Sequence, residues 1–62
     1  MFKVGDWVRT GYTTGRVVAK IIRFRTDRIN VAVLKTYPAS IEIERMTDEI
    51  EKCPGRKVPK TA

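Results

Sequence analysis

The chain has no histidine, and Cys53 is its single cysteine among 62 residues. One thiol cannot form an intramolecular disulfide, and one sulfur ligand cannot complete the tetrahedral shell of a zinc site. No apolar run approaches the ~18 residues that a membrane span needs, and the opening M-F-K-V-G-D reaches a turn signal too early for a secretory signal. We therefore expect a soluble, cytoplasmic protein that binds no metal and no membrane.

Catalytic side chains are equally scarce. Without histidine, neither Cys53 nor Ser40 has a base that could activate it as a nucleophile. Glu42 and Glu44 are spaced i, i+2, which places two carboxylates ~7 Å apart on one face of a strand. On an exposed face their pKa values would shift too little for acid–base catalysis, and Arg45 or an arginine of a neighbouring strand can balance them. We expect a non-catalytic protein that needs no cofactor.

The length allows one domain, near the lower limit for a chain that folds alone. A core of this size supplies about 3–5 kcal/mol, so a partner or self-association would add stability. Residues 54–62, P-G-R-K-V-P-K-T-A, combine two prolines and a glycine with three basic residues. They carry too little apolar surface to order themselves. The sequence predicts one domain at 1–53 and a basic, disordered tail at 54–62.

Basic residues outnumber acidic residues by 13 to 7, which gives a net charge of +6. The charge is segregated along the chain. Residues 1–35 hold eight basic and two acidic side chains, residues 36–53 hold two basic and five acidic ones, and residues 54–62 hold three basic ones. Such segregation usually produces a positive face and a negative face on the folded protein.

The longest apolar-rich stretch, Thr14–Phe24, predicts one long strand because it is rich in β-branched residues. Alternate side chains of a strand point to opposite faces. The apolar side chains of this strand change from one face to the other near Lys20 and Ile21, which predicts a bulge or sharp bend there. The polar turn Arg25–Arg28 then joins this strand to a second one, Ile29–Lys35, as a hairpin.

Shorter strands are predicted on either side of this hairpin. In Phe2–Thr10, a turn at Gly5-Asp6 would let Val4 and Val8 point inward together with Phe2.

The stretch Ser40–Arg45 alternates strictly, with Ile41 and Ile43 inward and the two glutamates outward. One helical turn at Met46–Glu49, capped by Thr47, precedes a closing strand at Ile50–Cys53. Five short strands with glycine-rich turns predict an all-β, strongly bent five-stranded barrel, and the period-2 runs argue against a helix bundle.

Four motifs occur in a fixed order: V-G-D-W-V at 4–8, G-R-V-V at 15–18, I-N-V-A-V at 29–33, and a helical turn before Ile50. Over residues 2–53 this order resembles the SH3-like barrel superfamily, including its KOW, Tudor and integrase C-terminal branches. KOW and integrase barrels bind nucleic acid, which the resemblance therefore implies here. Tudor barrels bind methylated side chains in cages of several aromatics, and the aromatic residues of this chain are too few and too scattered for that.

Residues 38–44, P-A-S-I-E-I-E, resemble the P-G-S-V-Q-I-Y strand of the plasmid-encoded type II dihydrofolate reductases, which are tetrameric SH3-like barrels. In that family the Gln-Ile-Tyr triplet lines a central pore where folate and NADPH meet. The matching positions here are Glu42, Ile43 and Glu44. Two carboxylates would make such a pore repel an anionic cofactor and an anionic substrate. The resemblance therefore concerns the fold, and a reductase is the most remote functional alternative.

The predicted site is a basic surface on the long hairpin. Its members are Arg16, Lys20, Arg23, Arg25, Arg28 and Lys35. Contacts from such a surface to phosphates would give salt-dependent binding of DNA or RNA with weak or no sequence specificity. Trp7 and Tyr12 could add base stacking, although Trp7 could equally cover one end of the barrel. The alternative is a protein-interaction module that self-associates or binds a host factor, because the charge distribution is bipolar.

Overall fold

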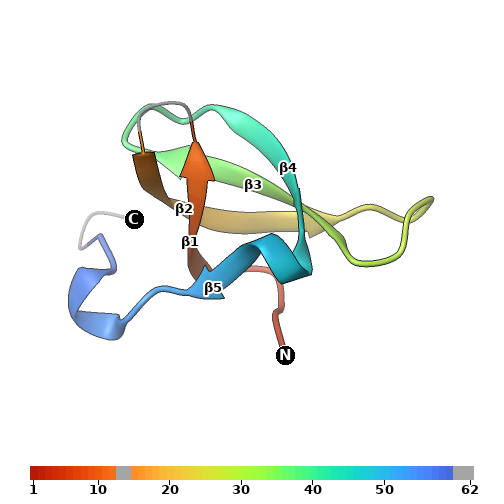
Figure 1. Ribbon diagram of the computed structural model, residues 1–62, viewed down its shortest axis with the longest axis horizontal. Helices are drawn as coiled ribbons and strands as arrows, with labels where there is room; N and C mark the ends of the chain where they lie inside the picture. The colour runs from red at the N-terminus through yellow and green to blue at the C-terminus, as the bar shows by residue number, and fades with distance from the viewer. Residues whose placement is uncertain (13–14, 60–62) are drawn as a thin grey trace.

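The structure, a computed structural model, describes residues 1–12 and 15–59. Its elements are β1 (Trp7–Tyr12), β2 (Gly15–Phe24), β3 (Val31–Tyr37), β4 (Glu42–Met46), the 3-10 turn η1 (Thr47–Glu49), β5 (Ile50–Lys52) and the 3-10 turn η2 (Gly55–Lys57). The strands form one antiparallel sheet of order β4-β3-β2-β1-β5 (Figure 1). The predicted all-β, five-stranded fold with one helical turn before the last strand is confirmed.

The long strand β2 pairs with β1 on one side and with β3 on the other. Its pairing with β3 shifts register between Ile21 and Arg23, so that Ile22 is an extra residue on β2. A bulge of this kind bends a strand and increases its twist, and β2 is strongly curved in Figure 1. The predicted bend is therefore present, slightly further along the chain than Lys20-Ile21. Thr14, the predicted first residue of this strand, lies outside the described residues.

The curved sheet encloses a small core. Its buried members are Val8, Ala19, Ile21, Ala32, Leu34 and Ile50, with Phe2, Phe24 and Ile43 packed against them. Two buried threonines have hydrogen-bond partners, as buried hydroxyls generally require. The Thr10 hydroxyl donates to the carbonyl of Glu49 at 3.3 Å, and the Thr36 hydroxyl accepts the N–H of Ile41 at 3.0 Å. Both bonds tie the segments next to η1 and β4 to the central strands.

Val4 and Ile41, which were expected to point inward, are exposed (59% and 44%), and so is Ile29 (86%), the predicted first residue of its strand. Each of them precedes the first residue of its strand, so the alternating pattern was extended too far toward the N-terminus. Asn30 (φ 63°) and Ser40 (φ 60°) adopt left-handed backbone conformations, which end the alternation just before β3 and shortly before β4. Val8 and Ile43 lie where they were predicted.

The sheet is compact but not closed by hydrogen bonds. β4 and β5 are its two edges, and no ladder joins them within the described residues. The turn η1 connects them instead, and its N-cap is Met46 rather than the predicted Thr47. The N–H of Met46 donates to Glu49 Oε1 at 2.9 Å, while the N–H of Thr47 donates to the carbonyl of Asn30 at 2.8 Å. The first bond closes the turn on itself, and the second holds η1 against the turn between β2 and β3.

The segment after β5 forms local hydrogen bonds within the described chain. The N–H groups of Lys57 and Val58 donate to the carbonyls of Pro54 and Gly55, at 2.8 Å and 3.2 Å. Residues 60–62 lie outside the described residues. The division into a barrel at 1–53 and a disordered tail at 54–62 stays a prediction.

The predicted turn at Gly5-Asp6 fixes the start of the sheet. The N–H of Asp6 donates to the carbonyl of Lys3, and the N–H of Lys3 donates to Asp6 Oδ2, both at 3.0 Å. The N–H of Gly5 then donates to the carbonyl of Ile21 at 2.8 Å, and the N–H of Ile21 donates to the carbonyl of Asp6 at 2.9 Å. Gly5 has φ +96°, a conformation that glycine adopts without steric cost.

Replacing Gly5 by alanine should therefore destabilise the protein through the backbone alone. A Cβ at this position meets nothing within 4 Å, so the expected loss of about 1–2 kcal/mol comes from the left-handed backbone conformation. Thermal denaturation should show a melting temperature lower by roughly 4–8 °C per kcal/mol. Gly11→Ala is the matched control, since its Cβ is equally unobstructed and its φ is not positive. Equal effects of the two substitutions would contradict the prediction.

Candidate functional site

One row of side chains crosses the outer face of the sheet. These residues alternate with the buried core positions and therefore point away from the core. Trp7 of β1 lies opposite Lys20 of β2, Lys20 lies opposite Lys35 of β3, and Lys35 lies opposite Glu42 of β4. The row thus presents an aromatic ring, two ammonium groups and a carboxylate on four neighbouring strands.

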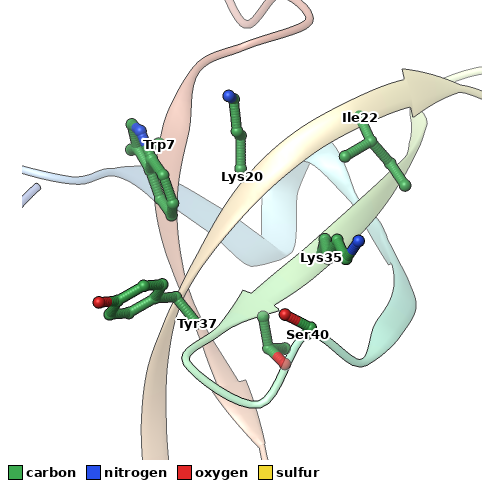
Figure 2. A pocket seen from close by; sticks show the side chains of 7 residues that line it. Trp7, Lys20, Ile22, Lys35, Tyr37 and Ser40 are labelled. Carbon is green, nitrogen blue, oxygen red and sulfur yellow. The ribbon is translucent and has the colours of Figure 1, made fainter. Parts of the chain in front are cut away.

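A groove of about 250 Å³ follows this row (Figure 2). Its lining consists of Trp7, Lys20, Ile22, Lys35, Thr36, Tyr37 and Ser40. The rings of Trp7 and Tyr37 meet edge to face, with centroids 6.2 Å apart and an interplanar angle of 87°. The ammonium of Lys20 lies 5.9 Å from the centre of the Trp7 ring, within the range of a cation–π contact. Two aromatic rings and two ammonium groups therefore border a single groove.

The two lysines form an uncompensated pair of like charges. Like charges directly opposite each other on adjacent strands destabilise a sheet. No ion pair within residues 1–12 and 15–59 includes Lys20 or Lys35. Glu42, which lies opposite Lys35, is instead paired with Arg23 at 3.8 Å. An anion in the groove would relieve the repulsion between the two ammonium groups.

On the β5 side of the sheet, Glu51 holds two arginines. Its carboxylate lies 2.5 Å from the guanidinium of Arg16 and 3.5 Å from that of Arg9, the residue directly opposite it on β1. The charge of Arg16, which was predicted to contact phosphate, is thus matched by a carboxylate of the same chain.

On the β4 side, Glu44 and Asp27 both bind Arg25. The guanidinium lies 2.9 Å from Glu44 and 2.6 Å from Asp27. The guanidinium donates hydrogen bonds to both carboxylates, and these bonds, to Asp27 first and to Glu44 second, raise the pKa of Arg25. The same contact with Arg25 holds the pKa of Asp27 below its ordinary value. Together with the pair between Arg23 and Glu42, this shows that both glutamates of β4 are paired with arginines. These arginines come from β2 and from the turn after it, and not from the adjacent strand β3.

The remaining candidates lie away from the groove. Arg28 is exposed in the turn between β2 and β3, and Tyr12 is the half-buried last residue of β1, opposite Gly15. Of the eight residues predicted for the site, the structure brings Trp7, Lys20 and Lys35 together in the groove.

Sequence reasoning missed Tyr37 and Ser40 as groove residues. Tyr37 follows Lys35 by two positions in β3 and therefore shares its face, a signal that the sequence contained. Ser40 reaches the groove through a turn with a left-handed residue, in which the N–H of Ser40 donates to the carbonyl of Thr36 at 2.8 Å. Nothing in the sequence specifies that turn.

No protein-family model, no curated protein and no solved structure matches the chain. The site is therefore interpreted from its own geometry. The described part of the chain contains no group of three or more acidic or cysteine side chains able to hold a metal ion. It also contains no helix long and apolar enough to cross a membrane.

Replacing Arg25 by glutamine should raise the pKa of Asp27 toward its ordinary value of 3.8, because the contact with Arg25 is the main cause of the depression. The contact between Arg25 and Asp27 stabilises the folded protein at pH values above 3.8. This stabilisation is lost as the pH falls through the lower pKa that Asp27 has in the folded protein. Carbon-detected NMR titration of the Asp27 carboxyl measures the change.

Asp6 provides an internal control for this titration. Its pKa is lowered by the backbone N–H of Lys3 and by Lys52, and Arg25 plays no part. The pKa of Asp6 should therefore stay low in the Arg25→Gln variant. Identical Asp27 titration curves in the parent and the variant would refute the assignment.

Proposed function

We propose that this protein is a non-catalytic module that binds nucleic acid through the phosphate backbone. The observation that carries the proposal is the pair of uncompensated ammonium groups, Lys20 and Lys35, in one groove with the rings of Trp7 and Tyr37. Neutralising phosphates with lysine releases condensed counterions, which drives binding to nucleic acid. Aromatic rings beside the lysines add a surface on which bases can stack.

The ion pairs reduce the basic surface that the sequence suggested. Arg16, Arg23 and Arg25 already meet carboxylates, so a phosphate must compete for each of them. The net charge of +6 still attracts a polyanion at long range. Few direct contacts and mostly backbone recognition imply weak or no sequence specificity.

We further propose that the chain is an SH3-like barrel. Support comes from the five antiparallel strands and from the 3-10 turn that precedes the last strand, the arrangement expected from the resemblance over residues 2–53. The nucleic-acid-binding branches of that superfamily agree with the proposed function.

A reductase function has less support. At the positions that match the reductase triplet, Glu42 and Glu44 are bound by arginines on the outer face, and Ile43 packs against the core. The amide and phenol of the reductase family are absent from these positions.

A protein-interaction function is the second candidate, and one end of the barrel favours it. Met1, Ile29 and Met46 are exposed there, and a second cavity of about 450 Å³ is lined in part by Met1, Phe2 and Phe24. Exposed apolar groups gathered around a cavity are typical of contact surfaces. Light scattering over a concentration series tests self-association, and a strict monomer would remove that form of the proposal.

Replacing both Lys20 and Lys35 by alanine should weaken binding to oligonucleotides about tenfold or more at 50 mM salt. It should also reduce the slope of log K against log salt by about 1.4, since each single-strand phosphate contact contributes ~0.7. Fluorescence anisotropy between roughly 50 and 200 mM salt measures both quantities. Arg25→Gln is the control, because it removes a cation that is already paired, and its affinity should change less than about twofold. Absence of binding by the parent protein at the lower salt would end the proposal.

Replacing Glu42 by glutamine should strengthen binding. The carboxylate lies opposite Lys35 and is paired with Arg23, so its removal eliminates a repulsion and releases a cation. Two unit charges ~7 Å apart in water interact with about 0.6 kcal/mol, which corresponds to roughly threefold in affinity. Asp48→Asn changes the net charge equally, but Asp48 lines the second cavity rather than the groove, so its effect should be smaller. An unchanged or lower affinity of Glu42→Gln would contradict the assignment of the groove.

A further inference from the structure

We infer that the groove receives one unpaired base of a single-stranded nucleic acid, stacked against Trp7, while the neighbouring phosphates contact Lys20 and Lys35. This inference rests on the proposed nucleic-acid function and adds to it the form of the ligand and the place of one base. Three observations carry it: the size of the groove, the position of the carboxylates around it, and the contact between Lys20 and Trp7.

The groove is small. Its volume of about 250 Å³ lies below the ~300–1,000 Å³ of pockets that enclose a whole small ligand. One ring-sized group can enter while the rest of its molecule stays outside. The walls suit such a ring, because Figure 2 shows Trp7, Lys20 and Ile22 along one side and Tyr37, Ser40 and Lys35 along the other. A flat base thus meets aromatic and aliphatic surface, with cations beside it.

The surrounding charges favour one strand over two. The unpaired cations Lys20 and Lys35 stand on adjacent strands, which lie ~5 Å apart. Carboxylates flank them on both sides, with Glu42 on the edge strand β4 and Glu51 on the edge strand β5. A duplex presents phosphate rows separated by grooves ~6 Å or ~12 Å wide. If one row contacts the lysines, the second row must compete with Glu42 or Glu51 for arginines that these carboxylates already hold. A single strand needs none of those arginines.

Lys20 links phosphate binding to base stacking. Its ammonium lies 5.9 Å from the centre of the Trp7 ring, over the surface on which a base would stack. Cation–π contacts at exposed sites are weak, so a phosphate can draw Lys20 away and uncover the ring. A base that is paired and stacked inside a duplex cannot reach the ring, but an unpaired base can.

Trp7 is the chain's single tryptophan, so its fluorescence reports on this groove without any substitution. The full chain is titrated with an oligothymidylate, an oligouridylate, an abasic oligonucleotide of equal length, and a duplex of equal length. We expect the two base-containing single strands to quench Trp7 and to bind about five- to hundredfold tighter than the abasic strand, the range of one stacked base. The DNA and RNA arms show which of the two backbones is preferred. Trp7→Leu has no tryptophan signal and is followed by the fluorescence anisotropy of labelled strands; it should bind the abasic and base-containing strands equally.

Each alternative result has a distinct meaning. Equal affinity for the abasic strand, or equal or tighter binding of the duplex, would overturn the base site and leave the proposed nucleic-acid function standing. Absence of binding to every oligonucleotide would remove both. A polyglutamate peptide that quenches Trp7 and displaces the oligothymidylate at equal affinity would show that the groove binds acidic peptides, which also overturns the inference.

Discussion

The strand β2 belongs to two ladders at once, and this double pairing organises the molecule. Its side chains alternate, so that Ala19 and Ile21 enter the core while Lys20 between them points outward. The extra residue Ile22 then bends the strand. A flat β2 could not wrap both neighbours around so few buried side chains. The core and the outer groove are therefore two consequences of the same alternation, and a change of register in β2 would exchange them.

The order of the strands also decides which charges remain unpaired. Segregation of charge along the chain predicted one positive face and one negative face. Because β4 pairs with β3 and β5 pairs with β1, the acidic segment instead borders the basic strands on both sides. Glu42 and Glu44 reach arginines of the β2 region, and Glu51 reaches Arg16. Exposed pairs of this kind add little stability, but none of the ion pairs within the described residues includes Lys20 or Lys35, which lie in the middle of the outer face.

Much of the fold was predictable, because alternation over a long strand is a strong signal. The long strand, its bend and the outward glutamates follow from periodicity alone. Ile29 and Ile41 were misplaced because the left-handed residues Asn30 and Ser40 interrupt the alternation. Those conformations depend on hydrogen bonds within the folded chain, such as the one from Thr47 to Asn30. The carboxylates that pair with the arginines could not be predicted either, because those pairs depend on the register between strands that are distant in sequence.

The size of the protein explains why its groove lies on the outer face of the sheet. The core is filled by six buried residues, two of them alanines, and close packing leaves no room for a ligand among them. The second cavity lies at one end of the sheet, between the N-terminal segment, the turn before β3 and η1. Across the sheet itself, what a chain of this length can offer is the outward half of its alternating side chains. On β1, β2 and β3 that half presents Trp7, Lys20, Lys35 and Tyr37 side by side. The same three strands supply five of the six buried residues of the core cluster, so the groove lies directly over the core.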